Sequence, residues 1–489
     1  MRRRLGLILG PAMLLLLLVP APDGMDPGAW RTAAVGLFMA AWWITEAIPI
    51  PATALIPLFL FPVLGVGSIG ESAAPYANPI IFLFMGGFLL AIAMQRWNLH
   101  RRIALSVVAA AGTDPHRLVL GFMVATAFLS MWVSNTATAV MMMPIGLSVI
   151  GLVAPDRETG EPSLLNFGTA LMLGIAYSAS IGGVATLIGT PPNALMAGYM
   201  LATYDLEIGF GRWMLIGLPL AVVTLPLTWL VLTRMAFPIR LPEIPGGRAT
   251  LLRELRRLGP ISPPERRVAA VFALTALAWV FRPFLESVVP GLNDTSIAIG
   301  AALVLFLLPS GAPSPEDPPP SEEGSATHHG ASVLDWTSAE QLPWGVLILF
   351  GGGLSLADAV TRTGLAEWIG SALSALDSWP TLLLVLTVTA VVVFLTELTS
   401  NTATAAAFLP VLGPLAVVLG EDPLLLVVPA ALAASCAFMM PVATPPNAIV
   451  YGSGYVTIPQ MVRAGIWLNL LFIALISVMS YLGVWQILL

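Results

Sequence analysis

Two copies of a polar pentapeptide, Ser-Asn-Thr-Ala-Thr, interrupt long apolar stretches of the chain at residues 134–138 and 400–404. A membrane-spanning helix needs about 20 apolar residues, and each of these stretches is too long for a single crossing. The polar centre of each stretch therefore falls where two shorter helices would meet. We predict two re-entrant hairpins, at 118–153 and 381–419, that hold serine, asparagine and threonine at membrane depth. Irregular backbone is tolerated there only where protein buries it or where it lines a cavity.

A second matching pair of interruptions, Thr-Pro-Pro-Asn-Ala, lies at residues 190–194 and 444–448. Proline removes a backbone donor and clashes with the preceding helical turn, so we predict that the helices unwind at 190–193 and 444–447. Unwound backbone offers carbonyl oxygens to a cation such as sodium. The start of a half-helix offers free N–H groups and a positive dipole end to a carboxylate. One site could thus hold cations by oxygen atoms and an anion by hydrogen-bond donors, without a buried arginine.

A purely structural interpretation of these polar residues is that they join helices by hydrogen bonds. A single cluster would favour that interpretation, but two clusters in matching positions, each with a matching Pro-Pro-Asn, favour a binding site. Glu46 and Glu397 also fall within predicted membrane spans, where an acidic residue is a candidate for function. For both residues, an alternative role is to orient the backbone around a hairpin.

The composition indicates an all-α integral membrane protein. The chain has 489 residues, of which 57% are hydrophobic and 10% charged, whereas soluble proteins carry about 25% charged residues. The single cysteine, Cys436, excludes an intramolecular disulfide, and no cysteine or histidine cluster suggests a structural metal site. The net charge of −6 argues against a nucleic-acid partner. No embedded Ser/His pair, Asp pair or metal cluster supports a membrane-embedded hydrolase, so we predict that the protein is not an enzyme.

An internal repeat relates the two halves of the chain. The spacing that aligns Phe-Met-Gly-Gly-Phe at 84–88 with Phe-Gly-Gly-Gly-Leu at 350–354 also aligns the two pentapeptides. The excess of arginine on the inner face of a membrane protein places the N-terminus inside and the C-terminus outside, in the cytoplasmic membrane. The outer side then holds only Arg31, Arg212, Arg282 and Arg362. This orientation gives about eleven transmembrane helices plus the two hairpins, in two inverted repeats, which is typical of secondary transporters.

The predicted division of the chain follows these repeats and hairpins. An N-terminal signal anchor or first span precedes the first repeat, and an alternative is that a leader within residues 1–22 is cleaved. An arginine-rich cytoplasmic connection and a disordered Pro/Ser/Glu-rich linker interrupt the rest. The segments are 1–28 (anchor), 29–233 (first repeat), 234–267 (connection), 268–308 (start of the second repeat), 309–335 (linker) and 336–489 (rest of the second repeat).

Three motifs together resemble the divalent anion/sodium symporter family, which includes the sodium-coupled di- and tricarboxylate transporters. They are Trp-Trp-Ile-Thr-Glu-Ala-Ile-Pro at 42–49, the two Ser-Asn-Thr tips, and Pro-Val-Ala-Thr-Pro-Pro-Asn at 441–447. The resemblance extends from about residue 30 to residue 489, apart from the linker. It implies a homodimer within the membrane lipid, in which each subunit has a scaffold domain and a transport domain that moves as an elevator. It also implies Na+ as the coupling ion.

The family's binding residues can be carried over by motif position. The resemblance implies a first sodium site at Ser130, Ser134, Asn135 and Gly189. It implies a second sodium site at Thr396, Thr399, Asn401 and Ala443. Thr399 stands where relatives often have a smaller residue, and it would contribute its carbonyl. The implied substrate-binding residues are Ser134, Asn135, Thr136, Thr190, Ser400, Asn401, Thr402, Thr444 and Pro445.

These features predict sodium-coupled symport of C4-dicarboxylates (succinate, malate or fumarate) by an elevator mechanism. A sulfate or citrate transporter of the same family is an alternative, as is a sodium-independent dicarboxylate exchanger. The hydroxyl and amide ligands are intact, and no basic residue near either tip could replace a cation, which favours sodium coupling. An ion channel is a further alternative, but inverted repeats with broken helices argue against it.

Overall fold

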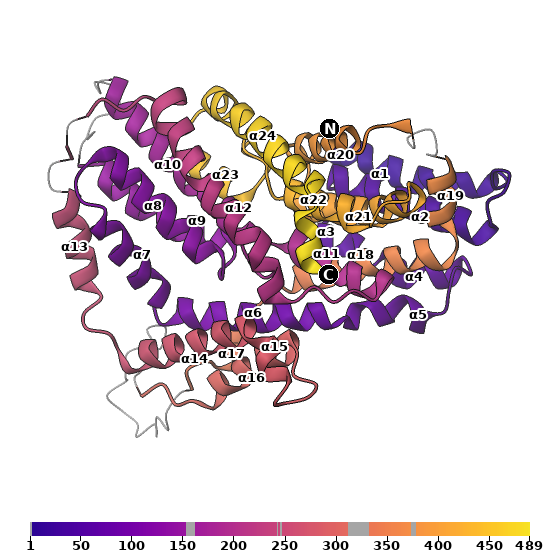
Figure 1. Ribbon diagram of the computed structural model, residues 1–489, viewed down its shortest axis with the longest axis horizontal. Helices are drawn as coiled ribbons and strands as arrows, with labels where there is room; N and C mark the ends of the chain where they lie inside the picture. Colours follow the sequence, from indigo (N-terminus) through magenta and orange to yellow (C-terminus); the bar gives the residue numbers. More distant parts are fainter. Residues whose placement is uncertain (1, 153–161, 242, 245–246, 312–331, 373–377) are drawn as a thin grey trace.

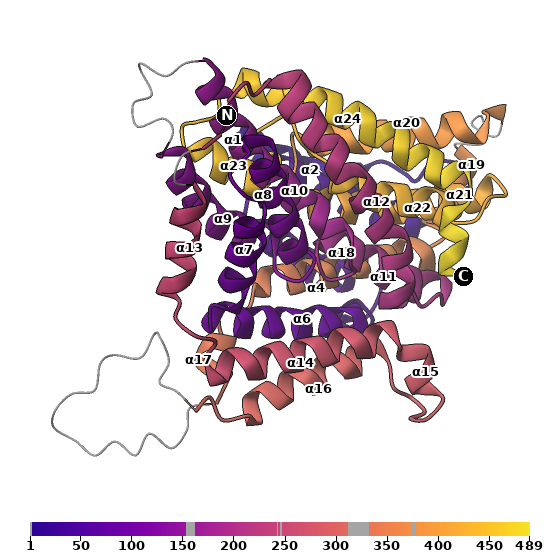
Figure 2. The same ribbon diagram turned by 60° about the vertical axis from the view of Figure 1, so that its left-hand side comes forward.

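The computed structural model describes the whole chain except residues 1, 153–161, 242, 245–246, 312–331 and 373–377 (Figures 1 and 2). All regular secondary structure in the described residues is helical, with one isolated β-bridge between Pro309 and Ser332. The prediction of an all-α protein is therefore confirmed for this part of the chain. Most of the predicted linker at 309–335 lies outside the described residues.

The helices follow one another in two halves. The first half contains α1 (Arg2–Met13), η1 (Leu14–Leu18), α2 (Pro27–Thr45), α3 (Ile50–Thr53), α4 (Ile56–Val63), α5 (Ile69–Ala73), η2 (Ala74–Ala77), α6 (Pro79–Arg96), α7 (Leu99–Ala110), α8 (Pro115–Ser130), α9 (Asn135–Ile150), α10 (Pro162–Val184), α11 (Pro191–Tyr204), α12 (Phe210–Leu230) and the π-helix η3 (Val231–Ala236). The second half contains α13 (Gly247–Arg257), α14 (Pro263–Val280), α15 (Arg282–Glu286), α16 (Asp294–Leu307), α17 (Trp336–Ala339), α18 (Trp344–Arg362), α19 (Leu365–Ala372), α20 (Thr381–Thr396), α21 (Asn401–Val418), α22 (Leu424–Ala434), α23 (Pro445–Gly452), α24 (Ile458–Tyr481) and η5 (Val484–Leu488).

Each predicted hairpin range is occupied by two helices joined by a short turn. In the first, α8 and α9 pack together around a turn at 131–134. In the second, α20 and α21 pack together around a turn at 397–400. The arms of the first hairpin lie on the left of Figures 1 and 2, and those of the second lie on the right. The two hairpins thus approach the centre of the molecule from opposite sides.

The unwound segments lie on the N-terminal side of the positions that the sequence predicts. The unwound segments are 185–190, between α10 and α11, and 435–444, between α22 and α23. The prediction of unwinding at 190–193 and 444–447 was wrong in position because both Pro-Pro pairs occupy the first turn of the following helix. A proline there needs no backbone N–H, and its fixed φ suits the start of a helix.

Six described helices are long and apolar enough to cross a membrane: Ile69–Arg96, Ser163–Val184, Phe210–Ala236, Trp344–Arg362, Asn401–Val418 and Ile458–Tyr481. Several other apolar helices are shorter, among them both arms of the first hairpin and the first arm of the second. These three arms and the half-helix α22 are shorter than a full crossing because the chain turns or unwinds within the apolar stretch. The number of eleven spans stays a prediction.

A layer of helices covers one side of the molecule. In both views α14, α16 and α17 lie below α6, while α24 runs along the opposite side. Helix α6 packs against all three of these helices. Gly86 of α6 faces α16 so closely that an added Cβ would lie 2.6 Å from the Cβ of Ala298. A small residue is therefore required at this helix crossing.

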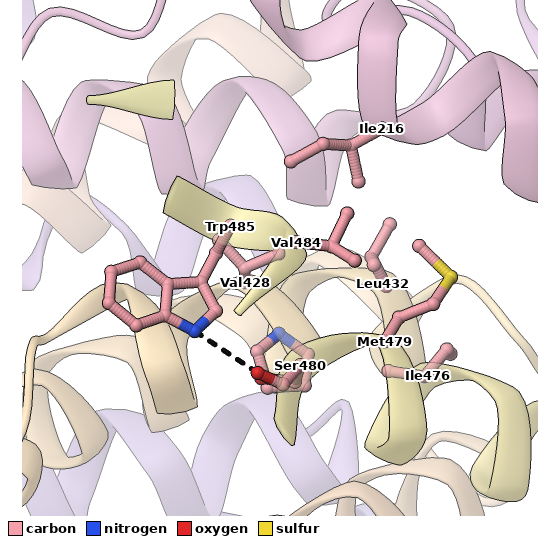
Figure 3. A pocket seen from close by; sticks show the side chains of 9 residues that line it. Ile216, Val428, Leu432, Ile476, Met479, Ser480, Val484 and Trp485 are labelled. Carbon is pink, nitrogen blue, oxygen red and sulfur yellow. Dashed lines mark hydrogen bonds between the residues drawn. The ribbon is translucent and has the colours of Figure 1, made fainter. Parts of the chain in front are cut away.

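The last helical turn, η5, folds back against α12, α22 and α24 (Figure 3). The indole N–H of Trp485 donates to the Ser480 carbonyl at 3.1 Å, and Arg212 of α12 donates to the Leu488 carbonyl at 3.1 Å. The cavity beneath Trp485 has a volume of about 10 Å³ and mostly apolar walls. A cavity of that size holds at most one water molecule, so this region is core rather than a binding site.

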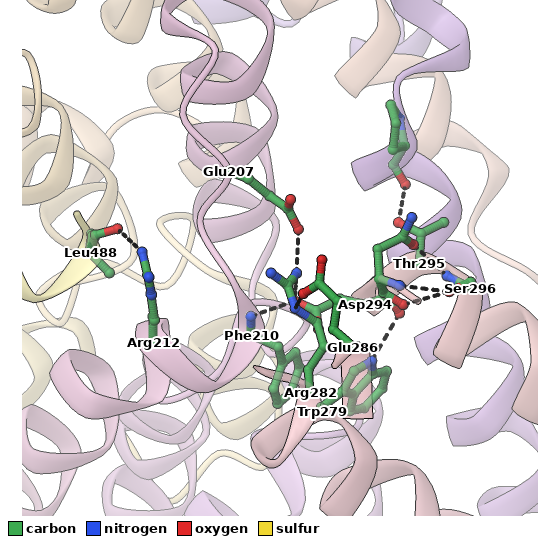
Figure 4. A network of polar contacts seen from close by, with 12 residues as sticks. Glu207, Phe210, Arg212, Trp279, Arg282, Glu286, Asp294, Thr295, Ser296 and Leu488 are labelled. Carbon is green, nitrogen blue, oxygen red and sulfur yellow. Dashed lines mark hydrogen bonds and ion pairs between the residues drawn. The ribbon is translucent and has the colours of Figure 1, made fainter. Parts of the chain in front are cut away.

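A network of charged residues connects the start of α12 to the layer formed by α14 to α16 (Figure 4). The Asp294 carboxylate accepts from the Phe210 backbone N–H at 2.6 Å and lies 3.5 Å from the Arg282 guanidinium, which also pairs with Glu207. The Trp279 ring stacks on Phe210 with a centroid separation of 4.3 Å. The chain between α11 and α12 is therefore anchored by charge and by aromatic packing.

Candidate functional site

A central cavity of about 660 Å³ lies where the two hairpin tips meet the two unwound segments. Its apolar wall includes Phe84 and Phe88 of α6 and Val346 of α18. Its polar wall contains every residue predicted to bind substrate: Ser134, Asn135, Thr136, Thr190, Ser400, Asn401, Thr402, Thr444 and Pro445. The structure therefore brings together residues that are widely separated in the sequence.

Four helices begin at this cavity. Their N-cap residues are Ser134 (α9), Thr190 (α11), Ser400 (α21) and Thr444 (α23), and all four line the cavity. The first N–H groups of a helix lack partners within the helix, and the helix dipole places about half a positive charge at that end. The described lining residues of this cavity include no lysine, arginine or histidine. Helix N-termini therefore supply the positive potential of the cavity.

Oxygen atoms converge at the first predicted sodium site. One terminal atom of the Asn135 side-chain amide lies 2.6 Å from the Ser130 hydroxyl, 3.1 Å from the Ala179 carbonyl and 3.2 Å from the Gly189 carbonyl. With the nitrogen in that position, the amide donates to all three groups. With the amide oxygen there, it faces the three oxygen atoms of these groups. Four converging oxygens are the environment that a hard cation requires. Ser134 lies beside this cluster along the chain and caps α9 by accepting from the Ala137 N–H at 3.3 Å.

The second predicted sodium site repeats the hydroxyl–amide–carbonyl part of this geometry. The Thr396 hydroxyl lies 2.9 Å from the Asn401 amide oxygen and 3.0 Å from the Ala434 carbonyl. The Thr399 hydroxyl is 3.0 Å from the Leu395 carbonyl and 2.6 Å from the Thr404 hydroxyl, so it is committed within the hairpin. Ala443, the fourth predicted ligand, lies in the cavity wall.

The asparagine of each Pro-Pro-Asn motif holds the unwound segment that precedes it. The Asn193 amide nitrogen donates to the carbonyls of Gly183, Val184 and Thr186 at 3.3, 3.2 and 2.8 Å. The Asn447 amide nitrogen donates in the same way to the carbonyls of Ala437 and Met440, at 3.1 and 3.0 Å. Both asparagines are fully buried. Sequence reasoning missed this role, although the repetition of the asparagine in both halves was its signal.

Glu397 orients the second unwound segment. Its carboxylate accepts from the backbone N–H groups of Phe438, Met439 and Met440 at 2.7 to 2.9 Å, and from the Asn469 amide at 2.8 Å. Of the two roles considered from the sequence, this geometry supports the orientation of backbone. The side chain is buried among groups that it holds in place.

Glu46 has a different environment from Glu397. It ends α2 in the left-handed conformation, with φ of 50°, and its side chain is exposed at the cavity wall. A glutamate in this conformation is uncommon, and backbone of this kind is often found near functional sites. Glu46 is the one ionisable residue among the described residues that line the central cavity.

The chain is similar in sequence to known transporters over nearly its whole length. The family described as the sodium:sulfate symporter transmembrane region matches residues 4–489. The chain is 45% identical over 482 residues to the sodium-dependent dicarboxylate transporter SdcS of Staphylococcus saprophyticus, which covers 97% of this chain and 90% of the relative. It is 44% identical over 483 residues to SdcS of Staphylococcus aureus, which covers 98% of this chain and 90% of that protein.

Two solved structures share the fold. The YdaH transporter of Alcanivorax borkumensis aligns with a TM-score of 0.55 at 18% identity, over 94% of this chain and 99% of its own. MtrF of Neisseria gonorrhoeae aligns with a TM-score of 0.56 at 13% identity, over 98% of this chain and 94% of its own. At these identities the likeness concerns the arrangement of helices alone.

Proposed function

The chain belongs to the sodium:sulfate symporter family, and on that premise we propose that it is a sodium-coupled symporter of C4-dicarboxylates such as succinate, malate and fumarate. Relatives named sodium-dependent dicarboxylate transporters share 44–45% of its residues over nearly the full length. The names of these relatives support dicarboxylates, rather than sulfate or citrate, as the proposed substrates. A transporter of this kind needs no catalytic group, and its specificity comes from the cavity.

One observation carries the proposal: four helix N-termini surround one cavity whose described lining residues include no basic side chain. Backbone N–H groups, the hydroxyls of Thr190 and Thr444, and the amides of Asn135 and Asn401 would donate to the two carboxylates of the substrate. Donors fixed in the backbone bind an anion without the ordering of long side chains. A volume of about 660 Å³ lies within the range of small-molecule sites.

We propose that two sodium ions bind beside the substrate, each at one hairpin tip. The first would be held by Ser130, Ser134, Asn135 and Gly189, and the second by Thr396, Thr399, Asn401 and Ala443. The convergence of oxygens on the amides of Asn135 and Asn401 supports this assignment. Bound sodium would offset the cost of bringing a dianion to membrane depth. The affinity for substrate then depends on sodium, and the affinity for sodium depends on substrate to the same degree.

We further propose an elevator mechanism in a homodimer within the cytoplasmic membrane, with the N-terminus inside. The two hairpins pack on the helices that follow them, α8 and α9 on α10 and α20 and α21 on α22. This packing supports their movement as one unit past the layer that contains α6, α14 and α16. The arginine distribution supports the orientation. The resemblance to the family supports the homodimer.

Competition between anions tests the substrate assignment. Sodium-dependent uptake of labelled succinate into proteoliposomes is measured with unlabelled succinate, malate, fumarate, citrate or sulfate added outside. We expect the three C4-dicarboxylates to inhibit with half-maximal concentrations within about tenfold of one another, and citrate and sulfate to inhibit far more weakly, because the site is matched to two carboxylates at a fixed separation. Stronger inhibition by citrate or sulfate would reassign the substrate and leave the fold unchanged.

A further inference from the structure

A second cavity, of about 520 Å³, adjoins the central one and is called the vestibule here. It is lined by Arg3, Glu46, Ile48, Pro49, Ile50 and Pro51. Glu46 and Ile50 line both cavities. The two cavities therefore meet at Glu46 and Ile50, on the side where α1 begins. A solute that enters or leaves on this side passes Arg3.

Arg3 is held in place by the packing of α1 on α2. Its Nε donates to the Ala47 carbonyl at 3.0 Å, and the indole N–H of Trp42 donates to the Gly6 carbonyl at 3.0 Å. Gly10 also faces Trp42, and an added Cβ there would collide with the ring. Arg3 is the second residue of α1, and the close approach of α1 and α2 holds its backbone in place.

The charged end of Arg3 remains available to a ligand. Its two terminal nitrogens make no hydrogen bond or ion pair with the described residues. Glu46, the acid that shares the vestibule, likewise lies beyond ion-pair distance of Arg3. An arginine with its Nε committed and its terminal N–H groups free presents donors that suit a carboxylate.

We propose that Arg3 is a docking point for a substrate carboxylate at the vestibule, and that Glu46 opposes it. Arg3 attracts the dianion and raises its apparent affinity at this face, while the like charge of Glu46 weakens retention and favours release. The central cavity has no basic side chain among its described lining residues, so Arg3 is the guanidinium that the anion meets on this path. This inference rests on the proposed function for the charge of the substrate.

Tracer exchange of succinate tests the proposal. Full-length protein in proteoliposomes is given equal succinate and equal, saturating sodium on both faces, so that every molecule works identically whichever way it is inserted. The KM and kcat of exchange are measured at low ionic strength and again after addition of choline chloride to both faces. Salt screens an exposed charge, whereas it leaves a purely structural contact unchanged.

Four variants give distinct expected results at low ionic strength. We expect Arg3→Gln to raise KM about three- to tenfold with kcat unchanged, which is the scale of electrostatic attraction by one charge at a cleft. Arg3→Lys should restore most of the affinity because it keeps the charge. Glu46→Gln should lower KM. Arg4→Gln is the matched control, because Arg4 is exposed on the same helix and lines neither cavity, and its KM should equal that of the wild type.

Choline chloride should raise the wild-type KM toward that of Arg3→Gln, because it screens the charge that the variant lacks. A wild-type KM for Arg3→Gln at low ionic strength overturns the inference. So does an increase that salt does not reduce, because that result would assign Arg3 a structural role alone. If the wild-type protein exchanges no succinate in sodium, the proposed function fails and this inference fails with it. If the wild type exchanges succinate and Arg3→Gln has the same KM, only the proposed role of Arg3 is ruled out.

Discussion

The hydroxyl of Thr396 lies 2.9 Å from the amide oxygen of Asn401, across the turn of the second hairpin. The first hairpin repeats this relationship between Ser130 and Asn135, at 2.6 Å. In each half the same hydroxyl also lies within hydrogen-bond distance of a carbonyl of the helix before the unwound segment, that of Ala434 or Ala179. Each hairpin tip is thereby joined, through a cluster of oxygens, to the helix that precedes its unwound segment. Binding of a cation at this cluster would fix both parts of the site together.

The two tip asparagines are expected to be indispensable for uptake. Asn135→Ala or Asn401→Ala removes the amide at the centre of an oxygen cluster and a donor to the substrate, so we expect sodium-dependent uptake of succinate to be lost while the protein still folds. Uptake is measured in proteoliposomes, and folding by size-exclusion chromatography. Asn166→Ala is the matched control, because Asn166 is outside the cavity and donates to the Pro238 carbonyl. Transport at the wild-type rate by either tip variant would refute the site assignment.

Gly183 is expected to be required for the first sodium site. A Cβ added there would lie 2.6 Å from Asn135 Oδ1 and 3.1 Å from the Gly189 carbonyl, so Gly183→Ala must displace atoms of the oxygen cluster. We expect the sodium concentration for half-maximal uptake to rise about 10- to 100-fold, as for other changes in the surroundings of a metal ligand. The control is Gly300→Ala on α16, where an added Cβ would have no neighbour within 4 Å. An unchanged sodium dependence in Gly183→Ala would show that sodium binds elsewhere.

Glu397 is expected to stabilise the second unwound segment. Glu397→Gln replaces one acceptor oxygen with a donor among three backbone N–H groups and the Asn469 amide. A buried donor left without a partner costs about 1–3 kcal/mol, so we expect a lower melting temperature in detergent and weaker coupling to sodium. Glu243→Gln serves as the control, since Glu243 is exposed and accepts from Thr113 alone among the described residues. A wild-type melting temperature for Glu397→Gln would contradict this role.

An ion pair at the start of α14 is expected to make stability depend on acid pH. Burial alone would raise the pKa of Glu265, but hydrogen bonds from Arg102 and Ser262 outweigh it and hold the pKa below its ordinary value of 4.5. Arg102 Nε donates to the carboxylate at 2.8 Å. The stabilisation is therefore present above pH 4.5 and is lost as the pH falls through the lower pKa of the folded state.

Thermal unfolding of Glu265→Gln across this range checks the expectation. The variant should be less stable than the wild type near neutral pH, and the difference should shrink as the pH falls below 4.5. Glu340→Gln provides a control, because Glu340 is exposed and carries no ion pair with the described residues. A difference that stays constant with pH would mean that the Glu265 carboxylate does not contribute through its charge.

Much of the site could be predicted from the sequence because its residues recur in pairs. Polar residues within apolar stretches have few roles, and their repetition in both halves indicated one shared cavity. The position of the unwound segments could not be predicted in the same way. Proline both disrupts a helix and starts one, and the structure uses the second property at Pro191 and Pro445.

The contributions of Glu397 and Arg3 depend on contacts that no local pattern reveals. Glu397 meets backbone N–H groups about forty residues further along the chain, and the motif around it does not indicate that partner. Arg3 reaches the vestibule through the packing of α1 on α2. No basic residue lines the central cavity, as far as the described residues extend, and the sequence did not indicate an arginine in the adjoining vestibule.

Uptake of labelled succinate into proteoliposomes with an inward sodium gradient tests the central claim most directly, with potassium or choline replacing sodium in parallel. The account predicts saturable uptake that requires sodium and exceeds equilibrium while the gradient lasts. Uptake without sodium that is stimulated by succinate preloaded inside would contradict it. That result would make the protein an exchanger and would remove both sodium sites while leaving the fold and the cavity in place.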